Sequence, residues 1–255
     1  MAFYSNPKIV TDGLVLALDA GSENSYPGSG TTWTDLSGNG NTCTLTDITF
    51  DSDGYIVFDG DGSYGVIDNS NSTIFSDDTD FTIEIWANKD TNSSNTSAMM
   101  LHYRGRYGYP SLTQFAYGAG SLITDGGLEV LYDDDDDGDA STGGNIVTER
   151  GVDVSLTGEM IQFISTYSRV GTTHTIQLYN NTINVDGGDA TSSHVWRKPT
   201  NPYADGIVIA SSAHNIGNTS HGFEGKFAIV RVYNKALTQA EITQNFNSQR
   251  NRFGI

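Results

Sequence analysis

The segment Phe81-Thr-Ile-Glu-Ile-Trp-Ala87 gives the clearest indication of how this chain folds. Its side chains alternate between apolar and polar, which is the pattern of a β-strand with one buried face. The apolar face carries Phe81, Ile83, Ile85 and Ala87. The opposite face carries Thr82, Glu84 and Trp86, and we expect it to be half-open and able to meet a ligand.

Short apolar runs recur along the rest of the chain, separated by clusters of Gly, Asn, Asp and Ser. Short strands at such spacing are typical of a β-sandwich or barrel. The other expected strands are Leu14–Asp19, Tyr55–Asp59, Gly65–Ile67, Met99–Tyr103, Leu128–Tyr132, Met160–Tyr167, Thr175–Tyr179, Thr182–Val185, Ile207–Ala210 and Phe227–Tyr233. Asn180-Asn181 is predicted to form a two-residue hairpin turn, because Asn tolerates the positive φ that such turns need.

One helix is predicted near the end of the chain. Thr238-Gln-Ala-Glu241 is a capping box, the pattern in which the first residue and the fourth satisfy each other's backbone N–H groups. Ala240, Ile242 and Phe246 supply apolar spacing behind it. No internal repeat or linker interrupts the sequence, so we expect residues 1–255 to form a single domain.

The composition excludes several classes of protein. The 255 residues include 24 Asp but only 7 Glu, and the formal net charge is -18, so the chain repels phosphate and nucleic acid is not an expected partner. A single cysteine, Cys43, excludes an intramolecular disulfide. No apolar run approaches the ~18 residues of a spanning helix. The first residues do not resemble a secretory signal, and we expect no membrane insertion.

Five segments of the chain, in their order, resemble the concanavalin A-like lectin/glucanase superfamily, in its laminin-G-like branch. They are Gly13–Ala20, Trp33–Asn41, Tyr55–Gly60, Phe81–Trp86 and Gly225–Ile242. The most specific is the last, in which Arg231-Val-Tyr-Asn-Lys-Ala-Leu237 runs directly into the capped helix. The resemblance implies an all-β fold: a jelly-roll sandwich of two antiparallel sheets with a short C-terminal helix.

The variant of this pattern that opens with Gly13-Leu-Val-Leu-Ala-Leu-Asp19 and ends with a Phe-Gly-Ile-like tail looks like structural proteins of marine tailed bacteriophages. The resemblance implies a structural role in the virion and no particular place in the particle. We expect a non-enzymatic capsid decoration or a tail or fibre component, made in the host cytoplasm. Its expected partners are other virion proteins, further copies of itself in a homo-oligomer, and cell-surface glycans. The alternatives are a carbohydrate-binding lectin for host-surface attachment and, third, a glucanase.

Glucanases hydrolyse glycosidic bonds with two carboxylates that lie close together. Alternate residues of a strand share a face, so such a pair is visible in the sequence of a strand. In the strand that begins at Phe81, the polar face carries Glu84, Trp86 and Asn88. It has one carboxylate and no second one to pair with it. No other expected strand carries two alternating acids. We therefore expect no enzymatic activity and name no catalytic residue.

The acidic segment Asp133-Asp-Asp-Asp-Asp-Gly-Asp139 is a candidate calcium site. Its residues Asp133, Asp135 and Asp137 precede a glycine in the Asp-x-Asp-x-Asp-Gly arrangement that wraps Ca²⁺, and Asp139 offers a further oxygen. The twelfth position is Gly144 instead of a bidentate Glu, so binding would be weak or completed by another segment. The alternative is a solvated anionic loop.

A second candidate site is rich in Tyr and Arg. Its residues are Tyr103, Arg104, Arg106, Tyr107, Tyr109 and Tyr117, together with Trp86 from the predicted open face. Flat tyrosine rings and forked guanidinium groups suit a sugar ring, but they also suit a subunit interface or loop packing, and these three interpretations stay open. A glycan site requires these aromatics to gather in one exposed concave patch, whereas Trp33, Trp86 and Trp196 also fit core packing.

Overall fold

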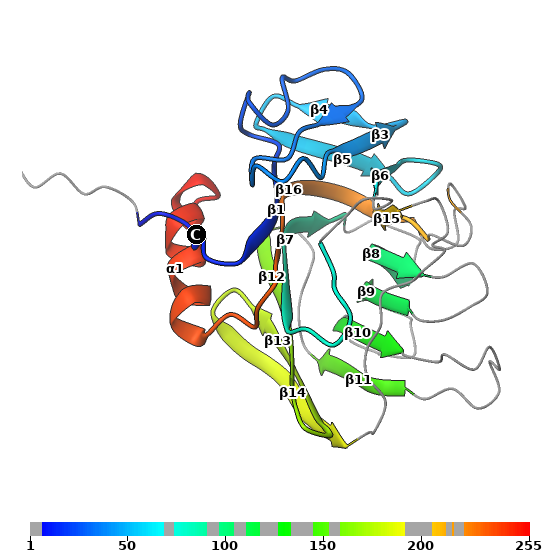
Figure 1. The fold of residues 1–255 in the computed structure, drawn as a ribbon. Helices are drawn as coiled ribbons and strands as arrows, with labels where there is room; N and C mark the ends of the chain where they lie inside the picture. The colour runs from blue at the N-terminus through cyan, green and yellow to red at the C-terminus, as the bar shows by residue number, and fades with distance from the viewer. Residues whose placement is uncertain are drawn as a thin grey trace, which may run out of the picture.

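The fold is taken from a computed structural model, which describes residues 7–68, 74–90, 97–104, 111–117, 127–133, 145–152, 159–191, 206–212, 216 and 222–255. Within these residues, two antiparallel sheets pack face to face and one α-helix lies on the outside (Figure 1). The predicted all-β jelly-roll sandwich of two antiparallel sheets with a short C-terminal helix is confirmed.

The first sheet, called sheet A, follows the order β14-β13-β12-β7-β16-β5-β4, and β1 also pairs with β16. Its strands are β1 (Leu14–Asp19), β4 (Thr49–Asp51), β5 (Tyr55–Asp59), β7 (Phe81–Lys89), β12 (Ile161–Val170), β13 (Thr173–Asn180), β14 (Ile183–Thr191) and β16 (Glu224–Tyr233). Strand β16 pairs with β7 along one edge and with β5 and β1 along the other. It is thus central and buried on both faces, which explains its nearly continuous apolar sequence.

The second sheet, called sheet B, follows the order β11-β10-β9-β8-β15-β6-β3-β2. Its strands are β2 (Thr32–Trp33), β3 (Cys43–Thr46), β6 (Tyr64–Asp68), β8 (Ser97–Arg104), β9 (Ser111–Tyr117), β10 (Gly127–Asp133), β11 (Asn145–Val152) and β15 (Gly206–Ile209). The sequence did not predict β2, β3, β9 and β11 of this sheet, nor β4 of sheet A. These strands are short or interrupted by polar residues, and their pairing depends on neighbours that are distant in the chain.

The turn between β13 and β14 lies one residue later than predicted. Asn180 pairs with Ile183, so the two turn residues are Asn181 and Thr182, and the prediction of Asn180-Asn181 is wrong. Asn181 has a φ of 56°, which agrees with the physical reason for the prediction, since Asn adopts the left-handed conformation more readily than most residues.

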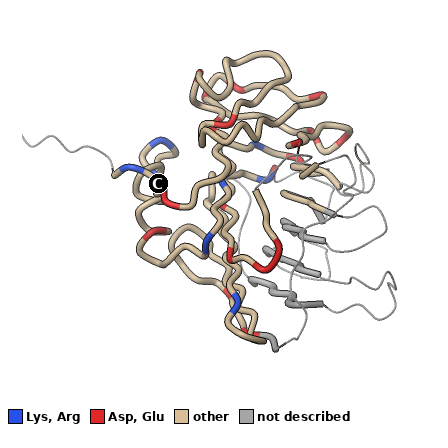
Figure 2. The backbone as a smooth tube through the Cα atoms, in the orientation of Figure 1, with Lys and Arg blue, Asp and Glu red and all other residues tan. Residues whose placement is uncertain are grey.

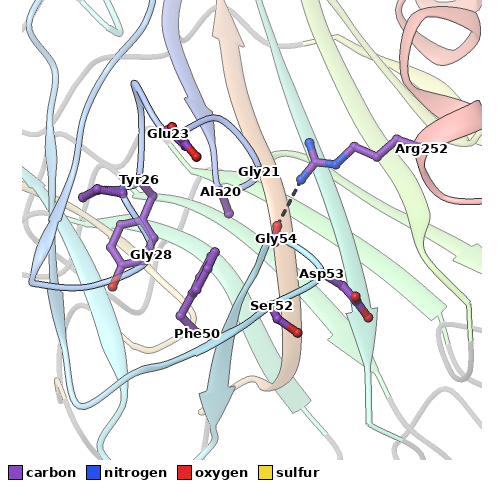
Figure 3. A pocket seen from close by; sticks show the side chains of 11 residues that line it. Ala20, Gly21, Glu23, Tyr26, Gly28, Phe50, Ser52, Asp53, Gly54 and Arg252 are labelled. Carbon is purple, nitrogen blue, oxygen red and sulfur yellow. Dashed lines mark hydrogen bonds between the residues drawn. The ribbon is translucent and has the colours of Figure 1, made fainter.

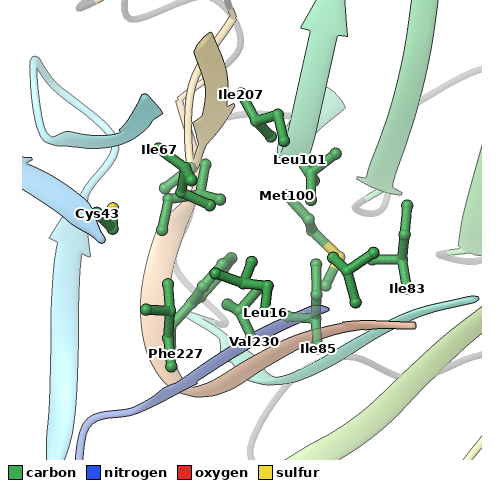
Figure 4. Packing of buried hydrophobic residues seen from close by; sticks show 14 of the residues in the cluster. Leu16, Cys43, Ile67, Ile83, Ile85, Met100, Leu101, Ile207, Phe227 and Val230 are labelled. Atoms are coloured by element: carbon green, nitrogen blue, oxygen red, sulfur yellow. The ribbon is translucent and has the colours of Figure 1, made fainter. Parts of the chain in front are cut away.

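The main core lies between the two sheets (Figure 4). Sheet A contributes Leu16, Ile85 and Val230, and sheet B contributes Ile67 and Leu101, all completely buried. Burial of one such side chain stabilises the fold by about 1.5–3 kcal/mol. The free thiol of Cys43 also lies in this core, and burial raises its pKa. Burial of apolar surface between the sheets therefore holds the sandwich together.

Helix α1 (Gln239–Gln249) covers part of the outer face of sheet A, which points away from sheet B (Figure 1). Thr238 is its N-cap, and the predicted capping box with Glu241 is confirmed. The helix buries Ile242 and Asn245, whereas Ala240 is exposed, so the contact face is displaced from the predicted one. Among the described residues, no helix is both long and apolar enough to span a bilayer.

The predicted half-open face of β7 is closed. Thr82, Glu84 and Trp86 are completely buried, because α1 and the short 3-10 helix η3 (Arg250–Arg252) with the residues after it lie over this part of the sheet. Trp86 stacks on Phe246 of α1 at 5.9 Å and on Phe253 at 4.8 Å between ring centroids. Periodicity along one strand shows which side chains share a face, but it does not show what covers that face.

Candidate functional site

The predicted aromatic patch does not form around Trp86 and Tyr103. Trp86 lies on β7 of sheet A and Tyr103 on β8 of sheet B, and their exposed fractions are 0% and 1%. Tyr103 stacks on Phe75 with 5.9 Å between ring centroids. Neither ring is therefore available to a ligand in this structure.

The remaining residues of that prediction have no described side chains. Arg104 ends β8, where its backbone pairs with Ser111, and Tyr117 ends β9. Arg106, Tyr107 and Tyr109 lie outside the described residues, as does Trp196. Trp33 is completely buried, as the packing interpretation expects.

The acidic segment begins inside the described structure and leaves it. Asp133 is the last residue of β10, and its backbone pairs with Ser111 and Asn145. Asp135, Asp137 and Asp139 lie outside the described residues. In the part of the chain that is described, no three or more His, Cys, Asp or Glu residues are arranged to hold a metal ion. Calcium binding by the acidic segment stays a prediction.

Glu84, the one carboxylate on the β7 face, is enclosed by donors. Its Oε1 atom accepts hydrogen bonds from Trp86 Nε1 at 2.8 Å, Gln162 Nε2 at 2.8 Å and Arg231 Nη1 at 3.0 Å. Its Oε2 atom accepts one from Asn245 Nδ2 of α1 at 2.8 Å. The carboxylate joins three strands to the helix and has no exposed surface, so it does not face a substrate.

A concave site is present elsewhere, at the edge of the sandwich where β4 and β5 meet the loop after β1. We call it the rim pocket; it has a volume of about 290 Å³ (Figure 3). It is lined by Ala20, Gly21, Glu23, Tyr26, Pro27, Gly28, Phe50, Ser52, Asp53, Gly54 and Arg252. Three segments that are far apart in the sequence thus supply one site.

Two aromatic rings line the apolar part of the rim pocket: Phe50 is partly exposed, whereas Tyr26 is only 2% exposed. Tyr26 and Phe50 have ring centroids 5.1 Å apart and planes tilted by 53° (Figure 3). The Tyr26 hydroxyl donates a hydrogen bond to the Gly30 carbonyl at 2.8 Å, and burial raises the pKa of this hydroxyl. Gly28 has a φ of 85°, which favours a glycine at this position of the loop.

Arg252 forms one wall of the rim pocket (Figure 3). Its Nη1 atom pairs with Asp19 Oδ1 at 2.6 Å, and its Nη2 atom donates to the Gly54 carbonyl at 3.0 Å. A Cβ on Gly21 would lie 2.1 Å from Nη2, so the guanidinium occupies space that only a glycine leaves free. Glu23, Ser52 and Asp53 add exposed polar side chains around it, and the pocket thus combines rings, a cation, carboxylates and a hydroxyl.

Two further hollows lie next to the rim pocket on the outer face of sheet A. The middle hollow, about 370 Å³, is lined by Asp53, Tyr55, Asn88, Glu159, Met160, Lys226, Phe253, Gly254 and Ile255. The far hollow, about 280 Å³, is lined by Val57, Phe58, Asp59, Asn88, Asp90, Glu224, Gly225 and Lys226. Both hollows lie over β5, β16 and β7, and residues 253–255 border the middle one.

Lys226 is the cation shared by the middle and far hollows. Its Nζ atom pairs with Asp51 Oδ2 at 2.6 Å and lies 5.2 Å from the centroid of the Tyr55 ring. The hydrogen bond from Lys226, together with that from the Asp53 backbone, lowers the pKa of the Asp51 carboxyl. Asp53, Asp59, Asp90, Glu159 and Glu224 line the same two hollows. Acidic positions also recur in the loops around β4, β5 and β6 (Figure 2). The site is therefore polar and predominantly acidic.

None of the rim-pocket residues was predicted from the sequence to belong to a site. The available indications were local turn signals, namely Pro27-Gly28 and Asp53-Gly54, which predict loops but not that the loops meet. The Arg252 side chain reaches these loops only because α1 and η3 lie across sheet A. No periodicity connects residue 252 with residues 20–54.

Residues 59–243, well over half of the chain, match the family described as the concanavalin A-like lectin/glucanases superfamily. The residues that line the rim pocket all lie outside this range. No curated protein sequence is similar to this chain.

The fold is similar to solved structures at low sequence identity. A Trypanosoma rangeli sialidase mutant with trans-sialidase activity is 14% identical with a TM-score of 0.61, over 97% of this chain and 34% of that chain. Domain 4 of an extracellular arabinanase from Geobacillus stearothermophilus, in complex with arabinotriose, is 15% identical with a TM-score of 0.60, over 94% and 99%. The binding domain of Paraclostridial Mosquitocidal Protein 1 is 16% identical with a TM-score of 0.58, over 94% and 53%.

The chain spans about a third of the length of the sialidase that it matches, and at these identities the similarity establishes the fold alone. The match over residues 59–243 establishes more: it includes Phe81–Trp86 and Gly225–Ile242, two of the five ordered segments, and it agrees with the observed sandwich. The chain belongs to the concanavalin A-like lectin/glucanases superfamily.

Proposed function

We propose that this chain is a non-catalytic recognition domain that binds carbohydrate at the rim pocket. The observation that carries the proposal is the combination of the partly exposed Phe50 ring with the polar groups of Glu23, Asp53 and Arg252 in one concave site. Sugar rings present apolar C–H faces and many hydroxyl groups, so they suit a site in which an aromatic ring adjoins carboxylates and a guanidinium.

Membership of a lectin/glucanase superfamily supports this proposal. Two of the similar structures belong to proteins that bind: one is an arabinanase domain in complex with arabinotriose, and one is the binding domain of a mosquitocidal toxin. The similarity to these structures concerns the fold. Carbohydrate binding by this chain is therefore our proposal.

The non-catalytic part of the proposal rests on Glu84. It is the single carboxylate on the β7 face, and four donors and the C-terminal helix enclose it. Glycosidases need two carboxyl groups about 5–10 Å apart that both reach the substrate. We expect a reducing-sugar assay on β-glucans to detect no product, and release of reducing ends by the purified protein would contradict this.

Carbohydrate binding is tested by screening the protein on a glycan array and measuring any hit by calorimetry. In the rim pocket, the variants Glu23→Gln and Asp53→Asn each remove one exposed charge. Each is expected to weaken binding by about tenfold, because hydrogen bonds to charged groups are stronger than neutral ones. Asp189→Asn on β14, the far edge of sheet A, removes the same charge as a control. An array without hits, or pocket variants that bind like the control, would overturn the proposal.

We further propose that this recognition domain is a structural component of a bacteriophage particle, either a capsid decoration or a tail or fibre protein. The supporting observation is the sequence resemblance of the opening segment Gly13–Asp19 and of the Phe-Gly-Ile tail at residues 253–255. Several copies in one particle would raise the avidity of a weak site. Mass spectrometry of purified particles is expected to detect the chain, and its absence from virions would contradict this role.

A further inference from the structure

The rim pocket, the middle hollow and the far hollow are neighbours that share lining residues. Asp53 lines both the rim pocket and the middle hollow. Asn88 and Lys226 line both the middle and the far hollow. In the strand register, Val57 of the far hollow pairs with Lys226, and Lys226 pairs with Asn88, so these three residues form one row across β5, β16 and β7. A ligand longer than one hollow can therefore contact more than one of them.

The size of the hollows favours a ligand that uses more than one of them. Their volumes of about 290, 370 and 280 Å³ each lie near the lower end of the ~300–1,000 Å³ typical of small-molecule sites. Each hollow alone offers few contacts, whereas the three in sequence form a long shallow path. An extended chain matches this shape better than a compact ligand does.

The charges along the path decide what kind of chain fits. Six carboxylates line it: Glu23, Asp53, Asp59, Asp90, Glu159 and Glu224. They repel an anionic chain, and the net charge of -18 adds to this repulsion. The cations Arg252 and Lys226 stand along the same path, and both are already paired with Asp19 and Asp51, so they do not offset the acids.

The same carboxylates attract a cationic chain, so the charges exclude anionic ligands only. Hydroxyl groups donate hydrogen bonds to carboxylates and accept them from ammonium and guanidinium groups, so a polyhydroxyl chain can pair with both kinds of residue. We propose that the three hollows together bind an oligosaccharide that is longer than a disaccharide and carries no negative charge. This inference rests on the proposed carbohydrate-binding function and names the ligand class for the same site.

Calorimetry with oligosaccharides of one to six units tests the inference. The uncharged probes are arabino-, xylo- and cello-oligosaccharides, the anionic probes are oligogalacturonides, and the cationic probes are glucosamine oligomers of equal length. For an uncharged series, we expect affinity to rise on the order of tenfold between two and six units, as contacts in the neighbouring hollows add to those in the rim pocket. At six units, the anionic series should bind on the order of tenfold more weakly than the uncharged series, and the cationic series should bind at least as tightly as the uncharged one.

Variants in the far hollow separate this inference from the proposed function. Asn88→Ala and Asp59→Asn should weaken binding of the six-unit probe and leave the two-unit probe unchanged, while Asp189→Asn alters neither. Circular dichroism and melting curves confirm that each variant is folded. Affinity that does not depend on length, or an anionic series that binds as tightly as the uncharged series, overturns the inference but leaves carbohydrate binding standing. Failure of every probe to bind overturns both.

Discussion

Glu84 and Arg231 form an ion pair at 3.0 Å between two side chains whose exposed fractions are 0% and 4%. The pair joins β7 to β16 on the outer face of sheet A, beneath α1. The same carboxylate also accepts hydrogen bonds from Trp86, Gln162 and Asn245, so it connects the sheet to the helix. A charge that is removed from water needs partners of this kind, because its desolvation is costly. This face of β7 is therefore a structural contact between the sheet and the helix.

The first prediction concerns this buried pair. Glu84→Gln removes the charge opposite Arg231 and places an amide N–H₂ among donors, so it should lower the free energy of unfolding by about 3–5 kcal/mol. Urea denaturation measures the change. The matched control is Asp78→Asn in the pair with Arg169, where Asp78 is 46% exposed, and it should cost at most about 1 kcal/mol. Equal losses in the two variants would show that Glu84 is not the centre of this contact.

The second prediction concerns the stack of rings that holds the residues after α1. Phe253 lies between Trp86, at 4.8 Å, and Tyr55, at 6.3 Å. Phe253→Ala should lower the free energy of unfolding by about 1–3 kcal/mol, and it should expose Trp86 to water. Denaturation curves and a red shift of tryptophan emission measure these effects. Phe253→Leu, which keeps an apolar side chain, should give a smaller shift, and an unchanged spectrum of Phe253→Ala would contradict the contact.

The third prediction concerns Gly21, whose missing side chain leaves space for Arg252. In Gly21→Ala, the new Cβ would collide with Nη2 and displace the guanidinium from Asp19. Because Arg252 is flexible and its pair is partly exposed, stability should fall by less than about 1 kcal/mol. Glycan affinity should fall as far as in Arg252→Ala, measured by calorimetry. Normal affinity in Gly21→Ala would show that the position of the guanidinium does not matter for the rim pocket.

The fourth prediction concerns alkaline pH. Burial, followed by the charge of Glu84, raises the pKa of the Tyr233 hydroxyl above its ordinary value of 10.0, and burial raises the pKa of the Cys43 thiol above 9.0. Both groups ionise more easily in the unfolded chain. Their contribution to stability is therefore complete below pH 9.0 and is lost progressively as pH rises through 9.0 and 10.0.

Urea denaturation at a series of alkaline pH values measures this loss. Cys43→Ala should remove the loss of stability that begins near pH 9.0. It should leave the loss that begins near pH 10.0, which is due to Tyr233. The relevant quantity is the slope of the unfolding free energy against pH, which the cavity created by the substitution does not change. A slope of the same size in Cys43→Ala between pH 9.0 and 10.0 would exclude Cys43 as its source.

The fifth prediction comes from the acidic segment at residues 133–139. If Asp133, Asp135 and Asp137 bind Ca²⁺, a chelator should lower the melting temperature, since a ligand that binds only the folded state stabilises it. Asp135→Asn should abolish the difference between chelator and millimolar calcium, and Asp189→Asn should preserve it. Identical melting curves of the unsubstituted protein in both conditions would favour the solvated anionic loop.

Much of the fold was predictable because its signals are local. The alternation of Phe81–Ala87, the apolar run of β16 and the capping box at Thr238 each describe one element through residues that are close in sequence. Strands such as β3 and β11 carry weaker patterns, and they form because neighbouring strands supply their hydrogen bonds. The prediction of an open β7 face also failed because of a contact between distant parts of the chain. The helix that covers this face begins about 150 residues after β7.

The sequence by itself determined that this chain is an acidic β-sandwich of a known superfamily with one capped helix, because strand alternation, turn residues and helix caps act over a few neighbouring residues. Only the tertiary structure decided that Glu84 and Trp86 are covered and that the rim pocket forms. That pocket requires Arg252 to reach the loops at Gly21 and Gly54, a contact between chain segments separated by about 200 residues. Such a contact depends on how the elements pack, and packing is a property of the whole fold.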